Sequence, residues 1–205
     1  MNQRVLSYFI RTVMIIPLFI SFIAISANGQ ETGNIQGNIV GYGDRYAPNT
    51  LVFIEDLTGD FEPPEEYAVI ELVDSEFVPS MLPILKGTTV DFRNSDAGWH
   101  NVYSPEQSVT PFNLGTYPPG HRRSMTFELI GVVPVTDFMH SEMTTYIIVL
   151  GNPFFAVTDR EGNYKINDVP TGTYSLRVWH EKWYADTQKV TVQDGKTITV
   201  DYKLE

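Results

Sequence analysis

Residues 85–94, Leu-Lys-Gly-Thr-Thr-Val-Asp-Phe-Arg-Asn, carry the pattern that decides the fold class. Leu85-Lys86-Gly87 has the composition of a turn, and in the residues after it the apolar Val90 and Phe92 alternate with polar side chains. A period of two predicts a β-strand with one buried face. The same period runs through most of the chain after residue 30, and no stretch of eleven or more residues repeats at helical spacing. The sequence therefore predicts an all-β protein.

Nine segments show this alternation clearly, and residues that favour turns separate them, as in Pro118-Pro119-Gly120. Residues 59–66 are acidic and contain proline, which indicates an exposed loop or linker. The predicted strands span residues 34–40, 50–55, 67–73, 88–94, 123–129, 146–150, 173–180, 188–192 and 197–203.

The composition excludes several classes of function. The chain has 205 residues, of which 42% are apolar, 13% aromatic and 19% charged, so its composition is globular rather than disordered. Its formal charge of −11 argues against a nucleic-acid partner, because such partners are bound by basic patches. The chain contains no cysteine, which excludes disulfides, thiolate metal sites, iron–sulfur clusters and cysteine nucleophiles.

The first 29 residues differ from the rest. Arg4 and Arg11 are their only charges, and an apolar run over residues 13–25 is shorter than the roughly 20 residues that a membrane-spanning helix needs. Small residues in Ala27-Asn28-Gly29 suit cleavage before Gln30, so residues 1–29 are interpreted as a secretory signal peptide. The alternative is an uncleaved anchor. We expect an exported protein, periplasmic or extracellular in a bacterium, with no membrane contact after cleavage.

The strand count predicts a discontinuous domain. Residues 152–205 supply about five strands, whereas a β-sandwich needs about seven. Residues 33–56 supply two strands that have no obvious mate in the middle of the chain. We therefore expect segments 30–62 and 152–205 to form one small sandwich, with residues 65–150 inserted as a second β domain. Insertion at a loop is tolerated because domain termini lie close together.

Two resemblances cover nearly all of the chain after residue 30. The segments around Gly37-Asn38-Ile39-Val40 and Val169-Pro170-Thr171-Gly172, with residues 48–53 and 156–164, resemble carboxypeptidase regulatory-like domains, which are small prealbumin-like sandwiches. The middle of the chain resembles a plastocyanin-like cupredoxin in residues 77–79, 86–94, 100–104 and 137–143. The combination is similar to exported bacterial proteins labelled methylamine-utilisation-like.

The cupredoxin resemblance implies a metal site. Cupredoxins bind copper through one His on an early loop and through Cys, His and Met on a late loop. Carried over, His100 and His140 match the two histidines and Met143 the axial ligand, while Asp137 stands where the family has its cysteine. Asn101 resembles the second-shell residue that links the two ligand loops. Without a thiolate the site cannot be type 1 blue copper, and a carboxylate favours Cu(II) or Zn(II) instead.

Two functions stay open at this stage. The first is metal binding or handling by a cysteine-less site derived from an electron carrier. The second is a metal-free binding or structural module with a decayed site, whose partner is an unknown protein or a carbohydrate. Four aromatic residues are candidates for a sugar-stacking surface, although scattered aromatics in a β-sandwich usually pack in the core: Trp99, Tyr117, Trp183 and Tyr184.

The remaining features favour structural roles. We interpret His121 and the run Trp179-His180-Glu181 as structural because they lie outside the cupredoxin motif. No Ser-His-Asp spacing, phosphate-binding glycine loop or zinc-protease helix is present in the sequence, so an enzyme is not expected.

Overall fold

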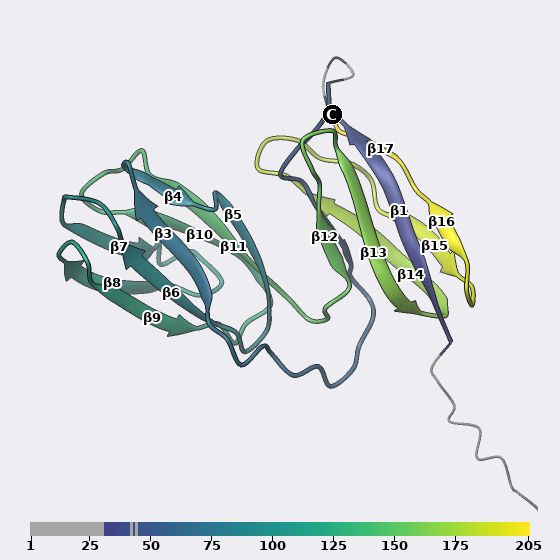
Figure 1. Cartoon of the computed structure of the whole chain (residues 1–205), viewed down its shortest axis with the longest axis horizontal. Coiled ribbons are helices and arrows are strands. Elements are labelled where there is room, and N and C mark those ends of the chain that lie inside the picture. Colours follow the sequence, from purple (N-terminus) through teal and green to yellow (C-terminus); the bar gives the residue numbers. More distant parts are fainter. Residues whose placement is uncertain (1–30, 42, 44) are drawn as a thin grey trace, which may run out of the picture.

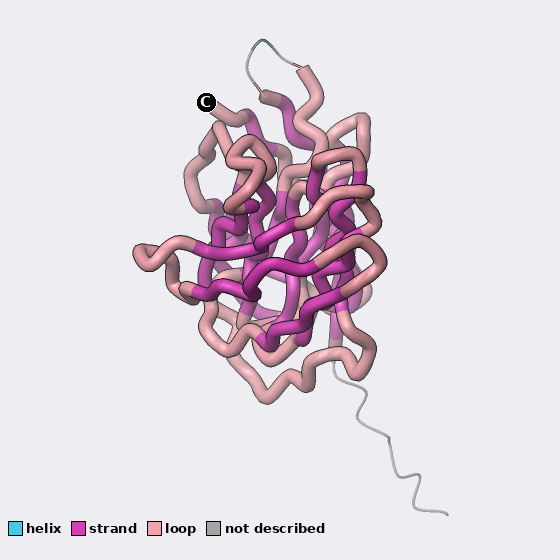
Figure 2. The backbone as a smooth tube through the Cα atoms, turned by 90° about the vertical axis from the view of Figure 1, so that its left-hand side faces the viewer, coloured by secondary structure: helices cyan, strands magenta, loops and turns pink. Residues whose placement is uncertain are grey.

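The computed structural model describes residues 31–41, 43 and 45–205. In this part of the chain seventeen strands are joined by loops, which confirms the predicted all-β class (Figure 2). No helix among these residues is long and apolar enough to cross a membrane. The predicted signal peptide lies outside the described residues.

The strands are numbered in chain order. The first half comprises β1 (Thr32–Val40), β2 (Leu51–Ile54), β3 (Ala68–Val73), β4 (Glu76–Val78), β5 (Met81–Leu85), β6 (Thr89–Asn94), β7 (His100–Ser104), β8 (Phe112–Tyr117) and β9 (Arg122–Thr126). The second half comprises β10 (Gly131–Asp137), β11 (Thr144–Leu150), β12 (Phe155–Val157), β13 (Asn163–Pro170), β14 (Gly172–Trp179), β15 (Gln188–Val192), β16 (Thr197–Thr199) and β17 (Tyr202–Lys203).

The first two strands pair with the end of the chain, as the strand count predicts. Strand β1 lies between β13 and β16 and also pairs with β17. Strand β2 lies between β12 and β14, and β15 completes that sheet. The two sheets face each other in the lobe on the right of Figure 1. Their buried side chains, among them Ile35, Ile39, Leu176 and Leu204, form one core.

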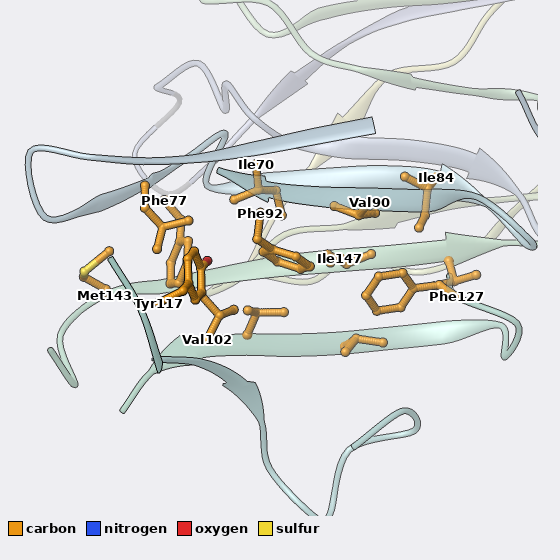
Figure 3. Close-up of a cluster of buried hydrophobic side chains, with 14 residues drawn as sticks. Ile70, Phe77, Ile84, Val90, Phe92, Val102, Tyr117, Phe127, Met143 and Ile147 are labelled. Carbon is orange, nitrogen blue, oxygen red and sulfur yellow. The ribbon is translucent and has the colours of Figure 1, made fainter. Parts of the chain in front are cut away.

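The segment between β2 and β12 forms a second sandwich, on the left of Figure 1. Its sheets have the orders β5-β11-β10-β7-β8 and β4-β3-β6-β9. Val90 and Phe92, the alternating apolar residues of segment 85–94, point into the core between these sheets together with Tyr117 and Phe127 (Figure 3). Asp91 is also buried, because Arg122 and Ser124 of the neighbouring β9 hold its carboxylate at 3.0 and 2.5 Å.

The chain crosses between the sandwiches twice, at residues 55–67 and 151–154. The rings of Phe61 and Phe154 meet edge to face with centroids 5.9 Å apart, so the two crossings contact each other. The buried Asn152 side chain donates to the carbonyl oxygens of Ile54 and Leu57 at 2.9 and 3.1 Å. The acidic residues of segment 59–66 are exposed, as predicted for a linker. A small apolar cluster then packs one sandwich on the other: Leu51, Met81, Ile148 and Leu150.

Several strands differ from the prediction. Strand β9 ends at Thr126 rather than at residue 129, and segment 197–203 is two short strands instead of one. The prediction missed seven strands, because they are short or lack a clean alternation and are held by their neighbours in the sheets rather than by local pattern. They are β4, β5, β7, β8, β10, β12 and β13.

Candidate metal centre

Two neighbouring strands and one loop bring the predicted ligands together. His100 is the first residue of β7 and Asp137 is the last residue of β10, and these strands pair with Asp137 opposite Val102. The loop between β10 and β11 carries His140 back over this end of the sheet. The antiparallel register therefore places an early and a late part of the chain side by side.

The Asp137 carboxylate is the centre of the cluster, and it is fully buried. One oxygen, Oδ1, accepts the backbone N–H groups of Met139 and His140 at 2.8 and 2.9 Å. The other oxygen, Oδ2, accepts the backbone N–H of Asn101 at 2.8 Å. These three bonds tie the loop after β10 to β7 through a single side chain. Charged acceptors form stronger hydrogen bonds than neutral ones, so Asp137 organises the site by itself.

Both imidazoles face this carboxylate through their Nδ1 atoms. His140 Nδ1 lies 3.0 Å from Asp137 Oδ1, and His100 Nδ1 lies 3.3 Å from Oδ2. The two rings are neighbours, with centroids 4.9 Å apart. His100, Asp137 and His140 each offer one ligand atom, and these atoms all lie within 4.8 Å of one another. The structure thus joins three of the four predicted ligands at one point.

A fourth residue, Asp96, orients His100, and the sequence interpretation missed it. Its Oδ2 lies 3.1 Å from His100 Nε2. A carboxylate only accepts, so a hydrogen bond here requires a proton on Nε2. Metal-binding histidines commonly donate their second N–H to a carboxylate in this way. The signal was the position of Asp96 four residues before His100, in the turn after β6.

The Nδ1 atom of His100 is buried and has no hydrogen-bond partner. It lies 3.3 Å from Asp137 Oδ2, and two electron-rich atoms at this distance repel unless a proton or a metal ion lies between them. Zinc holds nitrogen and oxygen ligands at about 2.0–2.2 Å, which places neighbouring ligand atoms of a tetrahedral site roughly 3.3 Å apart. Each imidazole has one carboxylate oxygen at about that spacing, His140 at 3.0 Å from Oδ1 and His100 at 3.3 Å from Oδ2, and one atom from each of the three residues lies within 4.8 Å of the others. The residues present therefore fit a small divalent transition metal.

Asn101 links the two ligand segments, but through its backbone. Its N–H donates to Asp137, and its carbonyl oxygen accepts the N–H of Phe138 at 2.8 Å. Its side chain instead points toward β8, where the amide donates to Thr116 Oγ1 at 3.3 Å. The bridging role that the resemblance assigned to this position is therefore met by main-chain atoms.

Met143 is buried at the end of the sandwich core that also holds Phe77 and Tyr117 (Figure 3). Its backbone N–H donates to the carbonyl oxygen of His140 at 2.9 Å, which closes the ligand loop as a turn. Its role as an axial ligand stays a prediction.

Tyr117 lies in the core behind the site, and its phenol is neutral. Tyr117 faces His100 across the β7–β8 pair and is fully buried, and its hydroxyl has no hydrogen-bond partner. Burial, reinforced by the negative charge of Asp137, raises the pKa of Tyr117 well above its usual range. Tyr117 is thus a core residue, which excludes it from the four aromatic candidates for a sugar-stacking surface, whereas Trp99 and Tyr184 are exposed.

On the other side the centre reaches the surface at His140, whose side chain is 35% exposed. Phe138 and Met139, in the same loop, are also exposed. A ligand entering from solvent therefore meets His140 first, whereas His100 and Asp137 lie beneath it.

Comparisons with known proteins match the end of the chain to one family. Residues 147–205 match the family of the carboxypeptidase regulatory-like domain. The match starts inside β11, five residues before the boundary expected from the strand count, and it does not reach β1 or β2. A search of curated proteins finds no match.

Solved structures match a part of the chain with low TM-scores. An oxidised amicyanin with a single substituted proline is 21% identical, and the match covers 40% of this chain and 81% of amicyanin with a TM-score of 0.38. A purple cupredoxin from Nitrosopumilus maritimus is 26% identical over 40% of this chain and 98% of its own, with a TM-score of 0.38. The copper-containing nitrite reductase of Thermus scotoductus SA-01 is 25% identical over 46% of this chain and 25% of its own, with a TM-score of 0.40.

Residues 147–205 match a carboxypeptidase regulatory-like domain, and the chain also has structural similarity to cupredoxins without their cysteine.

Proposed function

We propose that the protein is an exported metal-binding protein that holds Cu(II) or Zn(II) through His100, Asp137 and His140. The observation that carries this proposal is the buried, unpartnered Nδ1 of His100, which is aimed at a carboxylate that a second imidazole also faces. Met143 is the candidate for a weak fourth ligand. Export rests on the signal-like composition of residues 1–29.

The donor set argues against electron transfer of the blue-copper kind. Two imidazoles and a carboxylate are harder than a site with a thiolate, so they favour Cu(II) over Cu(I) and require more rearrangement on reduction. This donor set therefore suits binding or handling of the metal, with a colourless or weakly coloured centre.

Metal binding at this site depends on pH for a simple reason. In the structure His140 Nδ1 lies within hydrogen-bond distance of Asp137 Oδ1, and a bond there requires a proton on Nδ1. A metal needs a lone pair on that nitrogen, which a neutral His140 supplies by carrying its proton on Nε2. A protonated imidazole must instead release a proton, so binding weakens at a pH low enough to protonate the ring. The partly exposed ring of His140 provides the path for this exchange.

We also propose that the protein is not an enzyme. One serine does have a basic neighbour, because Lys189 Nζ lies 2.6 Å from Ser175 Oγ. Asp56 holds the same ammonium group at 3.1 Å and accepts from the serine as well. Since one carboxylate holds both groups, the cluster ties the segment after β2 to β14 and β15, and we assign it a structural role.

The direct test is calorimetry with Zn(II) and Cu(II) on the metal-free chain. We expect one site per chain, with an affinity that falls at least about a hundredfold in His140→Gln, since even outer-shell changes cost 10–100-fold. His121→Gln is the matched control, because His121 is exposed and lies outside the ligand group. No binding by the wild type, or equal binding by His140→Gln, would favour the metal-free module instead.

A further inference from the structure

A second site lies where the two sandwiches meet, and the metal centre does not use it. It is a cleft of about 350 Å³, within the range of small-molecule sites. Tyr146 of the inserted sandwich and Trp179 at the end of β14 meet there with ring centroids 5.1 Å apart and planes tilted by 58°. Because the cleft takes one wall from each sandwich, it exists only when both are folded and packed together.

The loop after β14 supplies the other wall and holds it rigidly. The rings of His180 and Trp183 are stacked, with centroids 4.6 Å apart and an angle of 11° between their planes. On the side of Gly41 there is no room for adjustment, because a Cβ at that position would lie 2.9 Å from the indole of Trp183. The wall is therefore formed before any ligand arrives, which limits the entropy lost on binding.

The imidazole of His180 is a neutral hydrogen-bond donor. Its Nδ1 lies 3.1 and 3.3 Å from the backbone N–H groups of Lys182 and Trp183, so Nδ1 accepts and the proton is on Nε2. Burial lowers the pKa of His180, with Glu181 opposing the effect, so the ring is uncharged at neutral pH. The run Trp179-His180-Glu181, interpreted as structural from the sequence, thus lines a cleft.

Charges at the cleft are balanced. Glu181 and Lys182 both line it, and neither side chain forms an ion pair within the described part of the chain. An acidic and a basic group side by side favour neither a cation nor an anion. They do suit hydroxyl groups, which donate to a carboxylate and accept from an ammonium or an imidazole N–H.

We propose that this cleft binds a neutral carbohydrate, with a pyranose ring against the aromatic side chains and its hydroxyls on Glu181, Lys182 and His180. Tyr46, which is 59% exposed, provides an accessible aromatic face at the rim. Aromatic side chains suit this task because they combine a broad apolar face with a polar edge. The cleft lies in the junction between the sandwiches, so occupancy also strengthens their packing.

The test is calorimetric titration of the full chain with soluble hexasaccharides of glucose, N-acetylglucosamine, xylose and mannose at millimolar concentrations. We expect saturable binding of at least one of them, weakened about tenfold in Tyr46→Ala and in Glu181→Gln, the loss expected from one stacking or hydrogen-bonding contact. Tyr184→Ala is the matched control, because this tyrosine is 66% exposed but lies outside the cleft.

Three outcomes would overturn the proposal. They are no binding of any of the four sugars, binding that both cleft variants retain, and binding of choline in place of sugar, which would make the cleft an aromatic cage for cations. His140→Gln separates this result from the metal proposal, since the variant is expected to lose metal and keep sugar.

Discussion

Replacing Asp137 in the metal-free protein tests whether this carboxylate organises the site by itself. The side chain accepts three backbone N–H groups, from Asn101, Met139 and His140, at 2.8–2.9 Å. Asp137→Ala removes both acceptor oxygens and leaves all three N–H groups unpaired. In Asp137→Asn the carbonyl oxygen can keep the amides of Met139 and His140, but the side-chain NH₂ then faces the N–H of Asn101. The two variants therefore leave three N–H groups and one N–H group unpaired at the same place.

The magnitude depends on the number of amides left unpaired. A buried donor without a partner costs about 1–3 kcal/mol, so Asp137→Asn should lower the free energy of unfolding by about 1–3 kcal/mol. Asp137→Ala should lower it by about 3–5 kcal/mol, because water that enters beside the partly exposed His140 relieves some of the loss. With an m-value of about 2 kcal/mol/M, the urea midpoints fall by about 0.5–1.5 M and 1.5–2.5 M.

Urea unfolding in the presence of a chelator, followed by circular dichroism, measures these shifts. Asp60→Ala is the control, since it removes the same charge from an exposed position in the linker and should leave the midpoint unchanged. The organising role of Asp137 is refuted if Asp137→Ala is as stable as the wild type or if Asp137→Asn is more stable. Either result would mean that the cost of burying the carboxylate exceeds the worth of its hydrogen bonds.

Three further predictions concern the copper chemistry and the second sandwich. Asp137→Cys with Cu(II) is expected to give an intense visible band from a Cu–thiolate bond, and a paramagnetic resonance signal of bound Cu(II) without such a band would show that the loop does not keep the ligand geometry. Asp56, whose pKa is lowered to about 2 chiefly by the backbone N–H of Ser175, stabilises the fold above its ordinary pKa of 3.8. Because its side chain is 40% exposed, Asp56→Asn should lower the free energy of unfolding by no more than about 1 kcal/mol. Thermal unfolding should show the stability difference between this variant and the wild type disappear as the pH falls from about 4 to about 2. Gly37→Ala places a Cβ in steric overlap with the carbonyl oxygen of Val200, so it should destabilise the sandwich of β1 by about 3 kcal/mol. Hydrogen exchange should then show lost protection in β1 and β13 with the Asp137 loop unchanged, whereas equal loss in both sandwiches would show that they unfold as one unit.

The fold class and the pairing of the two ends of the chain could be predicted from the sequence, because alternation is a local pattern and strands can be counted. Alternation around Val90 and Phe92 identifies a strand wherever it lies in the sheet. The shortage of strands in residues 152–205 required the segment before residue 56 to complete the sandwich. Strands such as β8 and β13 escaped prediction, because their hydrogen bonds to neighbours in the sheet, rather than their own pattern, make them strands.

For the candidate site, the sequence by itself determined which donor atoms are available. Cysteine is absent, and the resemblance predicted His100, Asp137, His140 and Met143 as ligands. Only the tertiary structure decided what these residues do, because the register of β7 with β10 sets which atoms meet. That register places both imidazole Nδ1 atoms near Asp137 and brings the backbone N–H of Asn101 within hydrogen-bond distance of its carboxylate, while Asp96, in the turn before β7, lies beside His100 Nε2. The cleft between the sandwiches depends on tertiary structure even more, because its walls come from both sandwiches. No sequence pattern in one sandwich indicates which residues of the other lie beside it.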